Sequence, residues 1–418
     1  MTLKDAVPQT SLARSSQSKS QSSSQSPSHL GQWVKLLLHQ GKRSWWMGLL
    51  FWLMAMAPAQ AELELRVAIE QDVSQVKVGS STDAILRDGS GRVLAQIPGM
   101  NAVLAAKKDG QIEVNQLEAS QLWVEPKQED GFVFIGDKWY RGRTLVVPTA
   151  GGLTAVNYVD LEHYLYSVVG SEMPPSWSLE ALKAQAVAAR SYALYQRQNS
   201  ANAVFDVGDT TQWQVYKGLE EETPSTRAAV DTTQGQVLTY SGQIINAVFH
   251  SCAGGFTENV EDVWSNPLPY LRGVPSPDQD MQGCKWEPLT LSADELSQKL
   301  GYDGTIYSVQ VQRHPHGRVI ALQIEGSAGT KTIEGEDVRE ELGLRSTLFS
   351  IESITGRVAT TGNLPASPTR FQISGSGFGH GVGMSQYGAY GLAQQGWNYQ
   401  QIVTHYFTGA QLARMQVR

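Results

Sequence analysis

The sequence predicts an α+β protein in which a strand-rich first part is followed by a core of mixed helices and strands. Residues 62–70 alternate apolar and polar side chains as a half-buried strand does, and short strands separated by turns continue to about residue 150. Helical spacing of apolar residues begins only after that point, at residues 161–168. We find no internal repeat of solenoid length. These observations place the strand-rich part at 62–150 and the mixed core at 151–418.

The first 61 residues predict an export signal. Residues 1–44 are rich in serine and should be disordered, because such a tract buries almost no apolar surface. In residues 45–61, an apolar run follows Lys42-Arg43 and ends in a small-residue cleavage pattern at Ala61. The run is shorter than the roughly 20 residues that a membrane span needs. Because a long leader precedes it, two outcomes stay open: cleavage after Ala61, or retention of residues 45–61 as a membrane anchor.

Charge and cysteine content exclude several classes of protein. The 418 residues carry 33 Lys and Arg against 40 Asp and Glu, a net charge of −7, and residues 1–61 hold six of the basic side chains but one acidic one. The remaining chain is therefore strongly acidic, which disfavours a nucleic-acid partner. Two cysteines are too few for a disulfide scaffold, a zinc-finger array or an iron–sulfur protein.

Capping and stop residues predict the elements of the core. Asp160 and Ser178 should cap two helices, with Gly170 ending the first. Further predictions are strands at 237–240 and 244–249, a short helix at 294–300 and a surface loop at 359–369. Two more helices are predicted at 386–395, with Ser385 as its cap, and at 399–408, with Asn398 as its cap.

Glu172 is the first candidate for chemistry. It lies in the segment Gly170-Ser171-Glu172-Met173-Pro174-Pro175, between two predicted helices and beside apolar side chains. Partial burial of a carboxyl group raises its pKa, which keeps it protonated and able to act as a general acid. The alternative is a surface glutamate in an interhelical turn.

The segment Gly375–Gln386 has glycine at every second position as far as Gly383. This pattern predicts a strand with one bare face that a flat group can approach. No βαβ unit surrounds it, which excludes a dinucleotide site. His380, Ser385 and Gln386 would then place polar groups beside the bare backbone, whereas close backbone packing with His380 in the core is the alternative.

Two further segments carry weaker signals. His250, Cys252 and Cys284 could supply three ligands to a structural zinc ion, but two cysteines in an exported chain also favour a disulfide, and free thiols remain a third possibility. Residues 206–216 mix amides, carboxylates and aromatic rings, including Gln214 and Tyr216, which suits either a sugar-lined cleft or a polar loop. A Ser-His-Asp hydrolase lacks support, because no Gly-x-Ser-x-Gly turn occurs in the required context.

Taken in order, several segments closely resemble the SpoIID/LytB family of stage II sporulation protein D and amidase-enhancer relatives. The matching stretches are Tyr140–Gly142, Val156–Leu165, Ser171–Pro174, Glu180–Ala193, Phe249–Asn259, Pro269–Leu271 and Gly379–Ala389. The resemblance covers nearly all of residues 62–418, so it does not depend on any single motif.

This resemblance implies a lytic transglycosylase that acts on peptidoglycan in the periplasm or cell wall, with an open glycan-binding cleft in residues 151–418 and an inserted subdomain at about 285–370. It assigns the catalytic acid to Glu172. It also implies that the enzyme prefers glycan strands already stripped of stem peptides by an amidase. The substrate-binding residues we expect are His380, Ser385, Gln386, Tyr387, Gln214, Tyr216 and Arg190. No cofactor is required, although one branch of the family has a His/Cys/Cys zinc site. The rival function is a non-catalytic wall-binding module that stimulates an amidase, and nothing in the sequence indicates sporulation.

Overall fold

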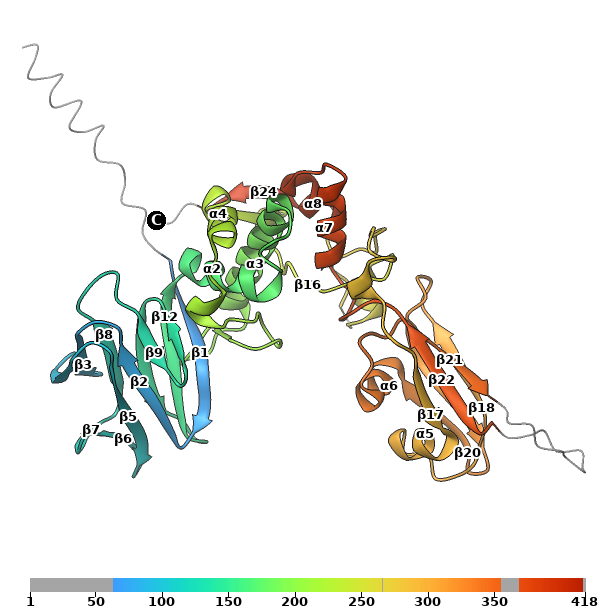
Figure 1. Cartoon of the computed structure of the whole chain (residues 1–418), viewed down its shortest axis with the longest axis horizontal. Coiled ribbons are helices and arrows are strands. Elements are labelled where there is room, and N and C mark those ends of the chain that lie inside the picture. Colours follow the sequence, from blue (N-terminus) through green and yellow to red (C-terminus); the bar gives the residue numbers. More distant parts are fainter. Residues whose placement is uncertain (1–62, 265, 355–367, 416–418) are drawn as a thin grey trace, which may run out of the picture. The chain divides into compact units, whose positions relative to one another are not determined.

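The structure of the protein, a computed structural model, describes residues 63–264, 266–354 and 368–415 (Figure 1). Residues Ala61–Arg418 form one compact unit. The export signal predicted in residues 1–61 and most of the loop predicted at 359–369 lie outside the described residues. The described part contains both helices and many strands, so the predicted α+β class is confirmed. None of its helices has the length and apolar character needed to cross a bilayer.

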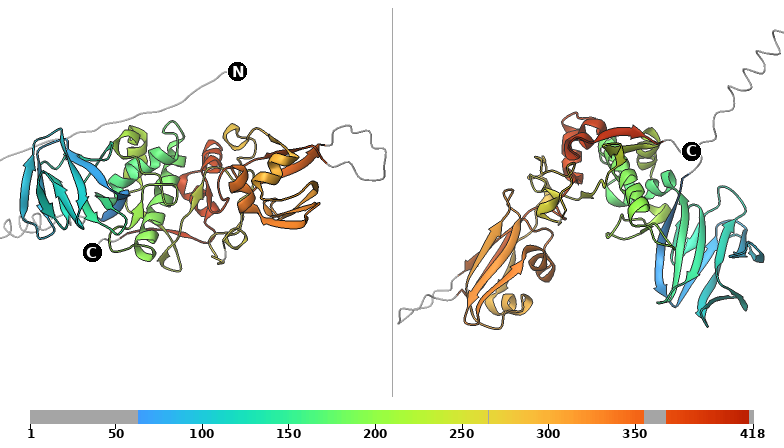
Figure 2. Two further views of the ribbon diagram at one scale, coloured as in Figure 1. Left: turned by 90° about the horizontal axis from the view of Figure 1, so that it is seen from below. Right: turned by 180° about the vertical axis from the view of Figure 1, so that it is seen from behind.

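The first part of the described chain consists of strands, shown in blue to teal in two further views in Figure 2. The strands are β1 Glu64–Val73, β2 Gln75–Ser80, β3 Ala84–Asp88, β4 Val93–Ile97, β5 Asn101–Lys108, β6 Gln111–Val114, β7 Leu117–Ala119, β8 Leu122–Pro126, β9 Val133–Ile135, β10 Lys138–Tyr140, β11 Arg143–Pro148 and β12 Leu153–Asp160. They form a seven-stranded sheet in the order β13-β1-β12-β11-β8-β3-β4 and a six-stranded sheet in the order β10-β9-β2-β5-β6-β7. In β1, Leu65 and Val67 are fully buried, as the predicted alternation requires.

The helices that follow pack on the same hydrophobic core as these two sheets. The elements are α2 Leu161–Glu172, α3 Leu179–Asn199, β13 Val207–Gly208, α4 Pro224–Thr232, β14 Gln236–Tyr240, β15 Gln243–Ile244 and β16 Phe249–His250, followed near the C-terminus by β23 Met384–Ser385, α7 Gln386–Gln394, α8 Tyr399–Tyr406 and β24 Gln411–Arg414. The predicted helix caps at Asp160, Ser178, Ser385 and Asn398 are confirmed, because each side chain accepts a backbone N–H of the first turn. The strand predicted at 244–249 is wrong in extent, since only its two ends are extended.

Helix α2 ends later in the chain than the sequence predicts. The sequence predicts that α2 stops at Gly170, but the helix continues to Glu172 and ends at Met173. A Cβ at position 170 would lie 2.0 Å from the carbonyl oxygen of Glu221. Glycine is therefore present because another backbone approaches the helix closely, and Glu172 becomes the last helical residue rather than part of a loop.

A second hydrophobic core occupies the stretch in which the sequence predicts an inserted subdomain. It is built from β17 Leu289–Ser292, α5 Ala293–Lys299, β18 Ile306–Arg313, β19 Val319–Gly326, β20 Gly329–Glu334, α6 Gly335–Leu342, β21 Phe349–Ile354 and β22 Arg370–Gly375. The strands pair in two three-stranded sheets, β17-β22-β21 and β18-β19-β20. Leu296, Leu322 and Phe371 are fully buried in this second core.

The glycine-rich segment is not the strand that its alternation predicts. Strand β22 ends at Gly375, and Gly377, Gly379, Gly381 and Gly383 all have positive φ, between 72° and 100°. Only glycine adopts such values without strain, so the segment is an irregular chain that ends at β23. At Gly381 the group that approaches the bare backbone is a side chain of the same protein, Arg318. A Cβ at Gly381 would lie 2.3 Å from Cζ of Arg318.

Candidate functional site

A cavity of about 550 Å³ brings together several of the segments that the sequence singles out. Its lining residues are Glu172 of α2, Tyr192 of α3, Thr211, Gln212 and Trp213 after β13, Val248, Phe249, His250 and Ser251 around β16, Trp264, Arg339 of α6, and Phe378, Gly379, His380 and Gln386. The volume lies in the range of ligand-binding clefts. Residues far apart in the sequence therefore meet at one opening that contains a carboxyl group.

Glu172 is held by two neutral hydrogen-bond donors. The backbone N–H of Val215 donates to Oε1 at 2.9 Å, and the side-chain amide of Gln386 donates to Oε2 at 3.2 Å. Among the described residues no Lys, Arg or His forms an ion pair with this carboxyl group. The side chain is thus fixed in position by neutral groups rather than by an ion pair.

Burial raises the pKa of Glu172 above its ordinary value. The two hydrogen bonds and the charge of Lys217 act in the opposite direction and favour the ionised form, but burial outweighs them. Burial, followed by the charge of the same carboxyl group, raises the pKa of Tyr192 to about 12, so its phenol stays protonated. The upward shift of the Glu172 pKa is in the direction that a general acid requires.

Aromatic side chains form much of the cavity wall, and the sequence analysis did not assign most of them. Trp264 and Phe378 are well exposed, at 41% and 44%, and Trp213 packs over Gly208, where a Cβ would lie 2.6 Å from its ring. Exposed aromatic rings that line a cavity offer flat apolar surfaces to a ligand. Trp213 lies within the segment 206–216 that was considered for sugar binding, and Tyr192 lies two residues after Arg190.

His380 lines the cavity, but both of its ring nitrogens are engaged. The backbone N–H of Val382 donates to Nδ1, and Nε2 lies 3.0 Å from the carbonyl oxygen of Phe249, so the ring is the neutral Nε2–H tautomer. Burial, followed by the charge of Arg318, lowers the pKa of His380 to about 4. His380 therefore offers a ring surface to the cavity, 4.9 Å from the ring of Trp264.

Of the three polar residues predicted next to His380, the structure places one in the cavity. Gln386 contacts Glu172, as described above. Ser385 is fully buried, where its hydroxyl caps α7 and bonds the carboxylate of Asp278. Tyr387 packs edge-on against Trp177 and is not part of the cavity lining. The substrate-binding assignments of Ser385 and Tyr387 are corrected to supporting roles.

Gln214 and Tyr216, which the sequence predicts to bind substrate, lie in the core rather than in the cavity lining. Both are almost fully buried. Gln214 accepts a hydrogen bond from Tyr164 and donates to the carbonyl of Ala189, while Tyr216 donates to Asn157. Their polar atoms are satisfied inside the core, and the neighbouring Thr211 and Gln212, which are exposed, and Trp213, which is half-buried, line the cavity instead.

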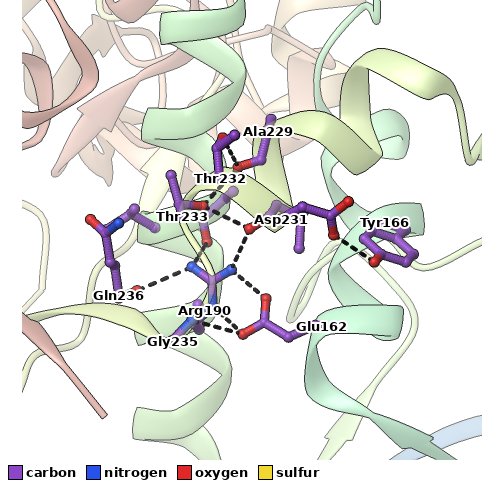
Figure 3. A network of polar contacts seen from close by, with 12 residues as sticks. Glu162, Tyr166, Arg190, Ala229, Asp231, Thr232, Thr233, Gly235 and Gln236 are labelled. Atoms are coloured by element: carbon purple, nitrogen blue, oxygen red, sulfur yellow. Dashed lines mark hydrogen bonds and ion pairs between the residues drawn. The ribbon is translucent and has the colours of Figure 1, made fainter. Parts of the chain in front are cut away.

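Arg190 is a structural residue rather than a substrate ligand. Its guanidinium is 0% exposed, contacts both carboxylate oxygens of Glu162, and donates to the carbonyl of Gln236 (Figure 3). The carboxylate of Glu162 also accepts the backbone N–H of Gly235. The pair therefore joins α2 and α3 to the start of β14, and the substrate-binding assignment of Arg190 is wrong because no part of it reaches the cavity.

The two cysteines form a disulfide, with a Cα–Cα distance of 5.6 Å, and no free cysteine remains. The predicted zinc set of His250, Cys252 and Cys284 does not fit, because both sulfurs are bonded to each other. His250 does not supply a third ligand atom next to the two sulfurs. Among the described residues, it is the carboxylate of Asp278 that lies within 4.8 Å of both sulfurs. Nδ1 of His250 instead faces the carbonyl oxygen of Val382 at 3.0 Å.

The disulfide supports the cavity wall. Cys252 and Phe378 exchange two backbone hydrogen bonds, and the N–H of Gly377 donates to the carbonyl of Cys284. The covalent link and these three hydrogen bonds fix the glycine-rich segment at the point where Phe378 meets the cavity.

A second acid lies behind this segment. Glu258 is fully buried, neither of its carboxylate oxygens has a hydrogen-bond partner, and Oε1 lies 4.0 Å from Nε of Arg318. Burial raises the pKa of Glu258 to about 7, although the charge of Arg318 lowers it. Arg318 also donates to the carbonyls of Gly379 and Ala253, so it holds the glycine-rich segment from behind.

Comparisons with known proteins identify the relatives of this chain. Residues 149–240, which contain Glu172 and Tyr192, match the family model of stage II sporulation protein, and residues 290–383 match a domain of unknown function (DUF8618). Stage II sporulation protein D of Bacillus subtilis is 37% identical over 279 residues, which are 62% of this chain and 76% of that protein. The chain belongs to the stage II sporulation protein D family.

Two other relatives show how widely the family similarity extends. An uncharacterized protein of Brachyspira hyodysenteriae is 34% identical over 304 residues, covering 72% of this chain and 79% of that protein. The amidase enhancer of Bacillus subtilis is 32% identical over 293 residues, but these span 59% of this chain and 40% of that relative. The family membership predicted from the sequence motifs is therefore confirmed.

Proposed function

We propose that the protein is a lytic transglycosylase that cleaves the β-1,4 bond between N-acetylmuramic acid and N-acetylglucosamine in peptidoglycan. The observation that carries the proposal is Glu172, a carboxyl group with a raised pKa that opens into a cavity and has no cationic partner in the described structure. The resemblance to the family assigns the catalytic acid to the same residue.

A single carboxyl group suffices for this reaction. Ordinary glycosidases need two carboxyl groups, about 5–5.5 Å apart or roughly 6.5–9.5 Å apart, because an enzyme carboxylate or an activated water attacks the sugar. In a transglycosylase the nucleophile is the C6 hydroxyl of the muramic acid. Protonated Glu172 donates its proton to the leaving glycosidic oxygen, and the resulting carboxylate accepts the proton of that hydroxyl as it bonds to C1. Glu172 ends protonated, and the product carries a 1,6-anhydro ring.

The surroundings of Glu172 suit both halves of this cycle. The Gln386 amide carries a donor and an acceptor, so it can hydrogen-bond the carboxyl group in either protonation state. The Val215 N–H stabilises the carboxylate that forms after the first proton transfer. The half-buried ring of Trp213 and the exposed rings of Trp264 and Phe378 offer flat apolar surfaces for the faces of successive sugar rings.

The test compares Glu172→Gln with wild type on peptide-stripped glycan strands. We expect the variant to form anhydro ends at least about 10²-fold more slowly while it still binds glycan and keeps its circular dichroism spectrum. Mass spectrometry identifies the reaction, because the anhydro product is one water lighter than a hydrolysis product. Glu220→Gln, a change at an exposed glutamate outside the cavity, is the matched control and should leave activity unchanged. Appreciable turnover by the Glu172 variant would falsify the assignment.

The second candidate function is a non-catalytic module that binds the wall and stimulates an amidase. The 32% identity to the amidase enhancer favours it. The same assay separates the two functions: new anhydro ends identify an enzyme, whereas retention on glycan without products, together with faster cleavage by an added N-acetylmuramoyl-L-alanine amidase, identifies a module.

Both functions require the protein to reach the wall, and we propose that residues 45–61 direct its export to the periplasm or cell wall. The buried disulfide supports an oxidising compartment. Cell fractionation followed by N-terminal sequencing tests this proposal. A mature chain that begins at Glu62 indicates cleavage, a membrane-bound full-length chain indicates an anchor, and a cytoplasmic chain overturns the proposal.

A further inference from the structure

Arg339 is the one permanently charged cation among the described residues that line the cavity. His250 and His380 also line it, but burial lowers the pKa of each and keeps both rings neutral. The acid of the cavity, Glu172, is protonated in the reactive state proposed above. The cavity thus has a positive end although the chain as a whole carries a net charge of −7.

The position of Arg339 comes from the second hydrophobic core. The neighbouring Val338 is fully buried there, and Leu342 is nearly so, which fixes the orientation of α6. Arg339 therefore enters the cavity from a different core than Glu172 does. Arg345, which follows α6, stacks over Phe378 at 5.4 Å and adds a second cation beside the lining.

The guanidinium of Arg339 retains capacity to bind an anion. Its partner is Glu336 on the same helix, whose side chain is 50% exposed, and such exposed pairs are weak and easily replaced. Its Nε–H is buried and has no hydrogen-bond partner. A planar guanidinium presents a fork of N–H groups that matches a carboxylate with two parallel hydrogen bonds.

We infer that Arg339 binds the lactyl carboxylate of muramic acid and so makes the protein select glycan whose muramic acid has no peptide. This inference rests on the proposed function. Attachment of a stem peptide converts that carboxylate to an amide, which removes the charge and adds bulk. An amide at this position cannot form a charge-assisted hydrogen bond with the Nε–H group that has no partner, whereas the free carboxylate can.

The test uses two glycans that differ in one group: stripped strands with free lactyl carboxylates, and the same strands converted to methylamides with carbodiimide and methylamine. Wild type should cleave the acid form with a kcat/KM about tenfold or more above that of the amide form. In Arg339→Gln this ratio should fall to about 1, and Arg339→Lys should restore part of it. A wild-type ratio of 1, or an unchanged ratio in Arg339→Gln, overturns the inference.

Two further variants sharpen the test. Arg370→Gln removes an exposed cation of β22 outside the cavity and should keep the wild-type ratio. Glu336→Gln removes the competing partner of Arg339 and should raise the ratio. Unchanged thermal midpoints show that each variant is folded.

Failure of the proposed function gives a different result. If wild type cleaves neither glycan, the affinities of the two glycans measured by calorimetry decide the inference separately. Tighter binding of the acid form that disappears in Arg339→Gln supports carboxylate recognition by a non-catalytic protein, and equal affinities overturn it.

Discussion

The two glutamates at the ends of α2 have different hydrogen-bond partners and different surroundings. Glu162, in the first turn, is bound by the fully buried guanidinium of Arg190 and by the N–H of Gly235. Glu172, in the last turn, is bound by one backbone N–H and one amide, and it opens into the cavity.

This comparison teaches that the partner, rather than burial alone, decides what a carboxyl group can do. A guanidinium that binds both oxygens of a carboxylate converts that carboxylate into a structural link between elements. Neutral donors hold the other carboxyl group in place but leave its proton available. Glu258, which faces Arg318 without a hydrogen bond, lies between these two cases.

The largest effect should come from removing the available proton. Glu172→Gln should lower the rate of anhydro-product formation by about 10²–10⁴-fold, the usual contribution of a general acid. Because its pKa is raised by folding, this carboxyl group favours the folded state most below its unfolded pKa and loses that contribution as pH rises through the folded value.

The free energy of unfolding, measured in urea at pH 5 and pH 8, checks the second part of this prediction. The variant should gain stability relative to wild type as the pH rises. An equal loss of stability at both pH values would instead indicate that Glu172 is a structural residue like Glu162.

Arg190→Met should have the largest effect on stability. It leaves the carboxylate of Glu162 without its cation, which should cost about 3–5 kcal/mol of unfolding free energy. Urea unfolding measures the loss. The double variant Glu162→Gln/Arg190→Met should be more stable than Arg190→Met alone, because no uncompensated charge remains. If the single variant loses less than the double variant, the pair is not the link that we describe.

Breaking the disulfide should have an intermediate effect. Reduction of wild type, or the double change Cys252→Ala/Cys284→Ala, should lower the unfolding free energy by about 2–4 kcal/mol. Dithiothreitol should destabilise wild type but leave the double variant unchanged, which separates the disulfide from side effects of the reagent. A chelator should not affect oxidised wild type, and a loss of stability on adding one would restore the zinc interpretation.

The smallest change per measurement concerns Glu258 and appears as a slope of the unfolding free energy with pH. Its pKa is raised from 4.5 to about 7 by folding, so the folded state binds a proton that the unfolded state has released in this interval. Wild-type stability should therefore fall between pH 4.5 and 7, by up to about 1.4 kcal/mol per pH unit from this group. Glu258→Gln should flatten the slope in a series of urea unfolding curves, whereas Glu220→Gln should leave it as in wild type.

Local signals allowed the sequence to predict much of the fold. The alternation in β1 and the capping side chains of α2, α3, α7 and α8 depend on neighbours a few residues away, so they are visible in the chain itself. Gly170 and the glycine-rich segment misled the prediction, because a stop, a bare strand and a close approach of distant backbone all require glycine.

The sequence likewise predicts only some of the residues of the candidate site. Motif resemblance located Glu172, His380 and Gln386, and the structure brings all three to one cavity. The motifs could not distinguish these three residues from Arg190, Ser385, Gln214 and Tyr216. A residue that is hydrogen-bonded inside the core and a residue that binds a ligand can occupy the same short motif.

The sequence by itself determined the class of fold, the family, the carboxyl group at position 172 and the presence of two cysteines. Only the tertiary structure decided that the cysteines are bonded to each other, that Arg190 is enclosed by Glu162, and that Arg339 enters the cavity from the second core. The physical reason is that charge and burial act through space: whether a polar side chain stabilises the fold or meets a ligand depends on partners that lie far away along the chain.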